Sequence, residues 1–357
     1  MLKDDYSFES NEKVRLPHTV TETPLHYFDE SEYQMISSYM KVLFIPKDWE
    51  EKDVYMTFEG VLHSCVVYVN GKAIGSHECG YTAFRVRLNE SVRFGGDNRI
   101  CVKADSREDQ NIPPFGFVID YMTYGGIYRD VYLEVKEKAH IEDVFVSADM
   151  DGNVRLEVKA TDAAKGAILE SSIYALDKKD AEEYIPKDER EFVKAEFYPE
   201  NEKNSVIYNG KFEKPLLWST DSPNLYLMKT VLKDVSGGVL DEYKVRFGFR
   251  NAEFRTDGFY LNNKKFKIRG LNRHQSYAYV GYAMPKNPQR NDAYILKEEL
   301  GLNAVRTSHY PQSHYFLDAC DELGLLVFTE LPGWQHIGDE VWKDRAVENV
   351  KDMVLQY

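Results

Sequence analysis

The sequence has few cysteines, no long apolar run and a shortage of positive charge. Its four cysteines, Cys65, Cys79, Cys101 and Cys320, are scattered over 357 residues without CxxC spacing. They are too few to stabilise a chain of this length as a disulfide framework, so we expect reduced, structural thiols. No stretch approaches the ~20 consecutive apolar residues of a membrane-spanning helix. The sequence therefore argues against a membrane protein.

Negative charge predominates along the chain. Lys and Arg number 45 and Asp and Glu number 59, which gives a net charge of -14. Such an excess repels a phosphate backbone, so nucleic acid is not an expected partner. The first ten residues also lack the apolar run and the small-residue cleavage site of a secretory signal. We therefore expect a cytoplasmic protein.

The composition is that of a globular protein with several cores. Apolar residues make up 43% and charged residues 29%, and a length of ~150 residues for each domain predicts two or three domains. Aromatic residues reach 13%. This enrichment suits β-sheets and also suits stacking on sugar rings, and composition alone does not separate the two uses.

Residues 38–250 show the pattern of antiparallel β-structure. Short alternating apolar runs, such as 54–58 and 65–69, are bounded by Gly, Asn and Asp, and Asn70-Gly71 predicts a tight hairpin turn. Residues 105–124 interrupt this pattern and predict a long ordered loop, where ligand contacts often lie. A charged stretch at 177–194 predicts a solvated loop or a sheet edge.

The periodicity changes after Gly258. Strands are predicted at 266–269, 303–307 and 325–329, helices at 292–300 and 313–323, and a further amphipathic helix at 347–357. This βαβαβ order is typical of a parallel α/β domain, whose site lies at the carboxyl ends of its strands. A complete (β/α)₈ barrel needs about 250 residues. We therefore expect a chain that stops inside a barrel, rather than a small open α/β domain.

Several motifs carry a family resemblance. The segment Asn303-Ala-Val-Arg-Thr-Ser-His-Tyr-Pro311, followed by Gly324-Leu-Leu-Val-Phe328, resembles the family 2 glycoside hydrolases. Weaker landmarks in family order include Gly125-Gly-Ile-Tyr-Arg-Asp130 and Phe247-Gly-Phe-Arg250. The resemblance implies a jelly-roll sugar-binding domain at 1–137, an immunoglobulin-like β-sandwich at 138–250, and the start of an incomplete TIM barrel at 251–357.

The resemblance also implies a chemistry. The family hydrolyses β-glycosides with retention, using two carboxylates about 5 to 5.5 Å apart. Its acid/base and nucleophile are glutamates after barrel strands four and seven, so we expect both of them beyond Tyr357 and no catalytic residue within this chain. Glu330 follows the third predicted strand, and we interpret it as a structural or pocket-wall residue.

By the same resemblance, part of the sugar pocket lies in this chain. His274 is similar to a family histidine that hydrogen-bonds the sugar, and Arg306 and His309 are similar to a pair beside the nucleophile. The full set of expected substrate-binding residues is Asp120, His274, Arg306, His309, Trp334 and His336. Trp334 stands where some family members have a glutamate that helps to hold Mg²⁺, and a hard cation needs oxygen ligands. We therefore predict no metal and no other cofactor.

Two hypotheses about the function remain open. The first is a β-galactosidase-like enzyme acting on terminal β-D-galactosides, with a β-glucuronide or a β-mannoside as alternative substrate. The second is a non-catalytic carbohydrate-binding or assembly protein. In both, a carbohydrate is the expected partner, and a homo-oligomer is one option for the assembly.

Overall fold

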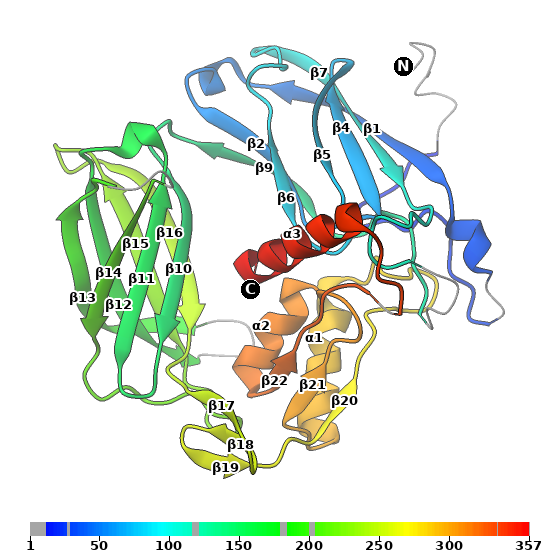
Figure 1. Ribbon diagram of the computed structural model, residues 1–357. Coiled ribbons are helices and arrows are strands. Elements are labelled where there is room, and N and C mark those ends of the chain that lie inside the picture. Colours follow the sequence, from blue (N-terminus) through cyan, green and yellow to red (C-terminus); the bar gives the residue numbers. More distant parts are fainter. Residues whose placement is uncertain are drawn as a thin grey trace.

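Two β-sandwiches and a short parallel α/β segment follow one another along the chain (Figure 1). The computed structural model describes residues 12–26, 29–115, 121–178, 184–199, 204–333 and 335–356. Within these ranges, no helix is long and apolar enough to cross a membrane.

The first sandwich consists of a four-stranded sheet, in the order β1-β7-β4-β5, and a three-stranded sheet, in the order β6-β2-β9. Alternate residues of β4, including Val67 and Val69, enter the core that the two sheets share. Asn70 and Gly71 both have positive φ, which confirms the predicted hairpin turn. The strands are β1 (Ile36–Ile45), β2 (Asp53–Phe58), β3 (Val61–Leu62), β4 (Ser64–Val69), β5 (Lys72–His77), β6 (Phe84–Arg87), β7 (Gly96–Asp105), β8 (Gly126–Ile127) and β9 (Val131–Lys136).

The second sandwich consists of the sheets β10-β11-β14 and β13-β12-β15-β16. Strand β13 lies at a sheet edge and carries residues 184–194 of the charged stretch at 177–194, which confirms the edge alternative for those residues. The strands are β10 (Ile141–Ala148), β11 (Asn153–Ala160), β12 (Ile168–Lys178), β13 (Tyr184–Glu196), β14 (Ser205–Lys211), β15 (Tyr226–Lys233) and β16 (Val239–Phe247).

The last segment contains three parallel strands in the order β20-β21-β22, which confirms the predicted βαβαβ pattern. A small antiparallel sheet, β17-β18-β19, precedes it. The elements are β17 (Ala252–Arg255), β18 (Gly258–Leu261), β19 (Lys264–Phe266), β20 (Gly270–Asn272), α1 (Lys286–Tyr294) with a π-helical extension (Ile295–Glu299), β21 (Ala304–Arg306), α2 (His314–Leu323), β22 (Leu326–Phe328) and α3 (Glu340–Gln356).

Three predicted boundaries in this segment were wrong. The strand expected at 266–269 is divided, because Phe266 pairs with Phe259 in an antiparallel hairpin and the first parallel strand begins only at Gly270. Helix α1 begins at Lys286 rather than at residue 292, since its first turns are polar and lack the apolar spacing used to find it. Helix α3 likewise begins at Glu340 rather than at residue 347.

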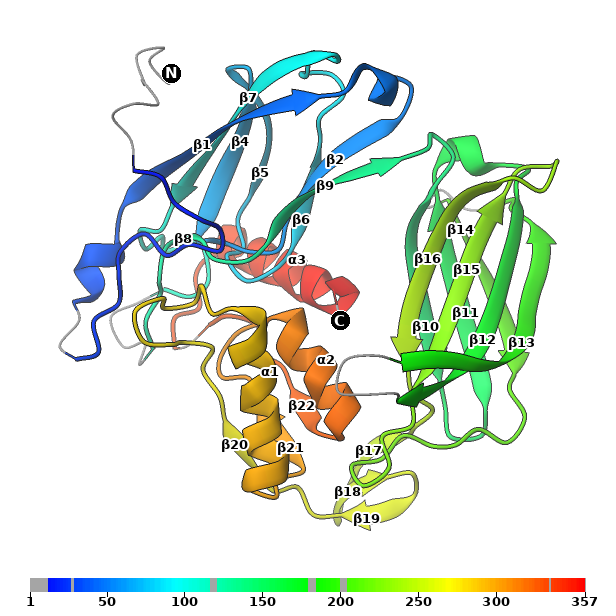
Figure 2. The same cartoon turned by 180° about the vertical axis from the view of Figure 1, so that it is seen from behind.

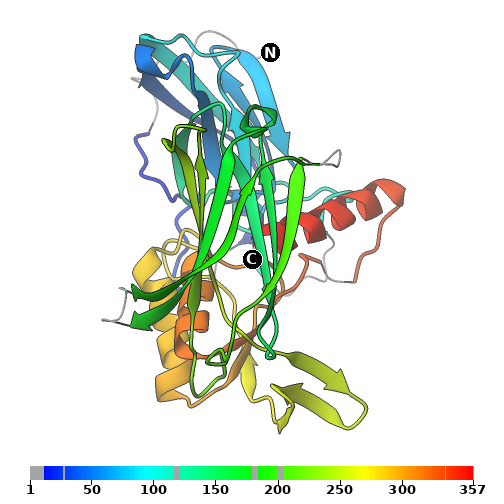
Figure 3. The ribbon, with the colours of Figure 1, turned by 90° about the vertical axis from the view of Figure 1, so that its left-hand side faces the viewer.

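The α/β segment lies against both sandwiches, and α3 runs beneath the first one (Figures 1 and 2). The side view shows α3 extending away from the second sandwich (Figure 3). A hydrogen bond from the amide of Ala83 to Gln356 and an ion pair between Arg345 and Glu78 join α3 to the first sandwich. Both contacts are made to the loop between β5 and β6.

Candidate functional site

The loops after the three parallel strands meet at one edge of the sheet. Gly270, Ala304 and Leu326 are in register across β20, β21 and β22, so the carboxyl ends of these strands are neighbours. Arg306 is the last residue of β21, His274 follows β20, and Glu330 follows β22. The structure therefore brings together polar residues that the strand pattern placed at this edge.

Glu330 is the carboxylate around which two predicted site residues gather. Its Oε1 atom accepts a hydrogen bond from Nε of Arg306, and its Oε2 atom lies 2.8 Å from Nδ1 of His309. An ionised carboxylate can only accept hydrogen bonds, so Nδ1 of His309 carries the proton. In this structure the carboxylate that Arg306 orients is thus Glu330 itself.

His274 lies beside His309 and contacts a buried tyrosine. The two imidazole centroids are 5.8 Å apart with the rings at 80°, and Nδ1 of His274 lies 3.2 Å from the hydroxyl of Tyr310. Tyr310 is fully buried, and burial raises its pKa well above the usual value. Tyr310 is therefore a neutral hydrogen-bonding partner for the histidine.

A buried arginine holds the loop that carries His274. The guanidinium of Arg273 lies 2.7 Å from Asp292 and 2.7 Å from Gln289, both on α1. It also stacks on the ring of Phe316 in α2, with 3.9 Å between its Cζ atom and the ring centroid. Burial lowers the pKa of Arg273, and the ion pair with Asp292 opposes that shift. The position of His274 is thus fixed from the helical side of the sheet.

The first sandwich also contributes to this edge, through Tyr121 of the predicted loop at 105–124 and through Arg129, which no pattern placed here. The ring of Tyr121 lies 5.8 Å from that of His274, 5.7 Å from that of His309 and 5.3 Å from that of Tyr310, measured between centroids. The guanidinium of Arg129 donates to the carbonyl of Pro311 at 2.8 Å.

His336, which is also among the expected substrate-binding residues, lies apart from this group. Among the described residues, His336 bonds the carbonyl of Gln110 at 3.1 Å and packs against the rings of Phe115 and Trp342, on the first sandwich and on α3. Asp120 and Trp334 lie outside the described residues. His274, Arg306 and His309 are therefore the three predicted residues that the structure places together.

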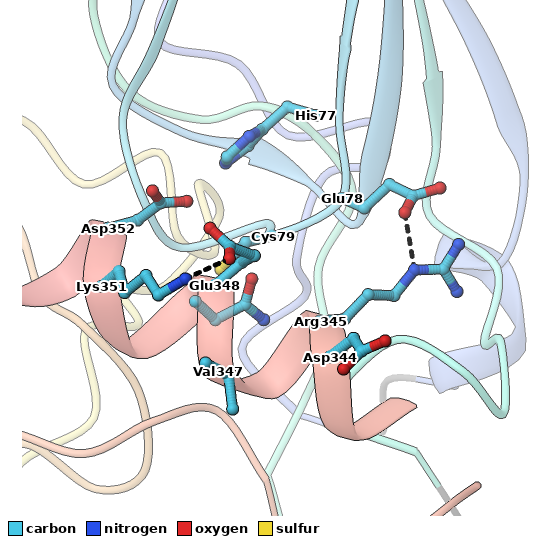
Figure 4. Close-up of a pocket in the computed structure, with 10 residues that line it drawn as sticks. His77, Glu78, Cys79, Asp344, Arg345, Val347, Glu348, Lys351 and Asp352 are labelled. Atoms are coloured by element: carbon cyan, nitrogen blue, oxygen red, sulfur yellow. Dashed lines mark hydrogen bonds and ion pairs between the residues drawn. The ribbon is translucent and has the colours of Figure 1, made fainter. Parts of the chain in front are cut away.

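A separate cavity of about 540 Å³ lies between α3 and the end of β5 (Figure 4). Its lining is strongly charged, but Arg345 pairs with Glu78 at 2.6 Å and Lys351 pairs with Glu348 at 2.5 Å. In the part of the chain that the structure describes, no group of three or more His, Cys, Asp or Glu side chains could hold a metal ion. The four cysteines are all buried and free.

Three sequence profiles from one family match consecutive parts of the chain. They are described as Glycosyl hydrolases family 2, sugar binding domain (residues 11–137), Glycosyl hydrolases family 2 (residues 139–250), and Glycosyl hydrolases family 2, TIM barrel domain (residues 252–352). The chain belongs to glycoside hydrolase family 2. This membership confirms the expected fold class: a jelly-roll sandwich, an immunoglobulin-like sandwich and the first βα units of an incomplete TIM barrel.

Curated relatives of this family 2 chain include two β-galactosidases. The protein from Thermoanaerobacter pseudethanolicus is 44% identical over 99% of this chain and 48% of its own length. The one from Thermoanaerobacterium thermosulfurigenes is 44% identical over 97% of this chain and 48% of its own length. A putative β-glucuronidase from Formosa agariphila is 33% identical. The chain spans about half the length of the β-galactosidases that it matches.

Solved structures of family 2 proteins also match. A Bacteroides uniformis β-glucuronidase aligns with a TM-score of 0.82 and 25% identity, over 99% of this chain and 42% of that one. A Parabacteroides merdae β-glucuronidase aligns with a TM-score of 0.81 and 26% identity, over 96% of this chain and 43% of that one. The arrangement of two sandwiches and a barrel segment is thus shared with these enzymes.

Proposed function

We propose that the whole protein to which this sequence belongs hydrolyses terminal β-D-galactosides with retention of configuration. The observation that carries the proposal is the 44% identity to β-galactosidases over nearly the whole chain. A β-glucuronide is the second candidate substrate, because the matching structures include β-glucuronidases with the same architecture. The first candidate rests on the higher sequence identity.

The proposal assigns this chain one side of the sugar pocket. His274, Arg306 and His309 would face the sugar, with Asp120, Trp334 and His336 as further substrate-binding residues. The two carboxylates of a retaining enzyme would come from strands four and seven of the eight-stranded barrel. Among the described residues, the parallel strands of the barrel are β20, β21 and β22, and Glu330 is held by Arg306 and His309. We therefore propose that the 357-residue chain has no turnover of its own.

The substrate is tested by comparing kcat/KM of the protein extended to the length of its relatives on aryl β-galactoside, β-glucuronide and β-mannoside. A preference for the galactoside is expected, and a preference for the glucuronide would establish the second candidate instead. Hydrolysis of any of the three by the purified 357-residue chain would overturn the proposal that it lacks both catalytic carboxylates.

Binding by the 357-residue chain is tested by calorimetric titration with galactose and lactose. We expect weak binding that is lost in the His274→Gln variant. Binding by a chain that, when extended, still fails to hydrolyse any glycoside would instead favour a carbohydrate-binding or assembly role.

The remaining assignments are part of the same proposal. We propose a cytoplasmic protein whose partner is a carbohydrate, with domains at 1–137, 138–250 and 251–357. Sedimentation of the purified protein measures the oligomeric state, and a homo-oligomer is the option that we would test first.

A further inference from the structure

Strand β1 forms one edge of the four-stranded sheet in the first sandwich. In the part of the chain that the structure describes, its one partner strand is β7, so its other side presents backbone amides and carbonyls that no described strand pairs with. Its pairing with β7 runs from Ile36 to Ile45 without a shift in register. The strand lies on the side of the molecule away from the second sandwich (Figures 1 and 2). This long, regular edge is therefore open to another strand.

Other edge strands carry features that discourage such pairing. Strand β13 contains Pro186 and shifts in register against β12, and β16 contains four charged residues and a shift in register against β15. Strand β1 has no proline, no bulge and one charged residue, Lys41. Its outward side chains include Ile36, Val42 and Phe44, which are 44% to 61% exposed. Charge, proline and bulges are what protect natural sheet edges, so β1 is an unprotected edge.

A second copy of β1 fits this edge. A two-fold axis perpendicular to the sheet makes the two strands antiparallel and keeps each outward side chain on the outward face. An axis at Met40 places Ile36 opposite Phe44 of the second copy. It places Ser38 opposite Val42 of the second copy, and the two Met40 side chains next to each other. The outward row is then mostly apolar on both sides of the axis.

Charge selects this register over its neighbours. With the axis at Met40, Lys41 lies opposite Tyr39 of the second copy, where a cation can lie against an aromatic ring. An axis at Lys41 would place the two lysines directly opposite each other, which is destabilising. An axis at Tyr39 would place Phe44 opposite Gln34, which is outside the strand. The axis at Met40 is thus the register that separates the lysines and uses the whole apolar row.

We propose that two copies of this chain associate through their β1 edges across a two-fold axis at Met40. The two four-stranded sheets then form one continuous sheet, in which each β1 is an interior strand. The proposal identifies a surface for the homo-oligomer of the proposed function, and it does not depend on the substrate.

Sedimentation velocity measures the association, both for the 357-residue chain and for the protein extended to the length of its relatives. We expect a concentration-dependent dimer. Val42→Lys should raise its dissociation constant about tenfold or more, because the axis places the substitution in the interface twice. Ile207→Lys is the matched control, since Ile207 is as exposed as Val42, at 47%, and lies on β14, an edge strand of the second sandwich. This control should leave the dissociation constant unchanged.

Disulfide trapping tests the register. Ser38 of one copy should lie opposite Val42 of the other, so a mixture of Ser38→Cys and Val42→Cys chains should form a cross-linked dimer on oxidation. Either variant alone should stay unlinked, because the axis separates like positions by about 13 Å along the strands. The four native cysteines are buried and should not interfere.

Four results would overturn the proposal. A protein that is monomeric at every concentration has no second copy on this edge, and slow hydrogen exchange of the β1 amides in that monomer would show that the same chain covers it. A dimer that Val42→Lys leaves intact would keep the homo-oligomer but move its surface elsewhere. Equal weakening by Val42→Lys and Ile207→Lys would mean a general effect of charge. Cross-linking of either cysteine variant alone would exclude the axis at Met40.

Discussion

The two sandwiches contact the α/β segment through interfaces of different chemistry. The first sandwich uses a cluster of buried tyrosines, in which Tyr81, Tyr121 and Tyr124 meet Tyr282 and Tyr310. The second combines ion pairs, from Arg246 to Asp318 at 2.7 Å and to Glu322 at 2.6 Å, with an apolar cluster in which Trp218 and Leu225 meet Ala304 and Leu326. Two rings of the tyrosine cluster, those of Tyr121 and Tyr310, contact the ring of His274.

The two kinds of contact differ in how their contribution to stability depends on salt and pH. A buried aromatic interface gains its free energy from apolar burial and close packing, and its contribution changes little with salt or pH. An interface of partly exposed ion pairs contributes less and depends on both. The site residues are thus attached to the interface that is less sensitive to solution conditions.

The largest expected effect comes from opening a cavity in the aromatic interface. Tyr282 is 2% exposed and its ring lies within 5.1 Å of that of Tyr310, centroid to centroid. Tyr282→Ala should lower the free energy of unfolding by about 4 kcal/mol, as measured by urea titration. The control Tyr294→Ala, at a half-exposed helical position, should change it by less than about 0.5 kcal/mol. Equal losses in both variants would contradict the assigned importance of the cluster.

Arg129 tests the polar part of the same interface. It donates to the carbonyls of Pro311 and Tyr81, at 2.8 and 3.0 Å, and is 5% exposed. Arg129→Met should cost about 3 kcal/mol, because these buried carbonyls lose a charged donor. Its burial predicts nearly the same loss at 0.05 M and at 1 M NaCl. A loss that vanishes at high salt would show that Arg129 acts as an exposed ion pair does.

Arg246 tests the ion pairs between the second sandwich and the α/β segment. Its removal in Arg246→Met breaks two ion pairs, one of them to Asp318, whose side chain is 47% exposed. We expect a loss of about 2 kcal/mol at low salt, because hydrogen bonds to charged groups are lost. The loss should shrink at 1 M NaCl. The same denaturation series on Arg129→Met and Arg246→Met compares the interfaces directly, and equal salt responses would remove the distinction.

Asp321 gives an effect of the opposite sign, because its substitution should stabilise the chain. Burial raises its pKa to about 6, against the opposing influence of Arg246 and Arg250. The folded chain therefore keeps this proton up to a higher pH than the unfolded chain, and the free energy of unfolding falls as the pH rises from about 4 to about 6. Asp321→Asn should be more stable than the parent chain by up to about 3 kcal/mol at pH 7.

Urea midpoints for parent and Asp321→Asn chains at pH 4, 5, 6 and 7 measure this effect. The two curves should converge toward pH 4, where the carboxyl is protonated in the folded state. A gap that stays constant across the series would rule out the ionisation of Asp321 as its cause.

The fold was largely predictable because strands and helices leave periodic patterns. The alternating runs at 54–58 and 65–69 correspond to β2 and β4, and the helix predicted at 313–323 corresponds to α2, which Gly324 ends in a left-handed conformation. The failures have local causes. Phe266 has the residue type of a buried barrel strand, but its pairing with Phe259 is a contact that periodicity does not encode.

The candidate site was predictable only in part. His274, Arg306 and Glu330 follow parallel strands, so their meeting at one edge follows from topology. Their pairings do not: Arg306 and His309 share Glu330 because of where their side chains reach. Tyr121 and Arg129, from the first sandwich, carried no pattern that linked them to residues 150 to 200 positions later in the chain.

The sequence by itself determined the order of two β-sandwiches and a parallel α/β segment, the family, and the strand ends that carry polar residues. These follow from periodicity and from motifs read along the chain. Only the tertiary structure decided which ring nitrogen of each histidine is engaged, which acid Arg306 holds, and which sandwich reaches the site. Hydrogen bonds and ring contacts act over a few ångströms, and folding alone brings residues so far apart in sequence within that range.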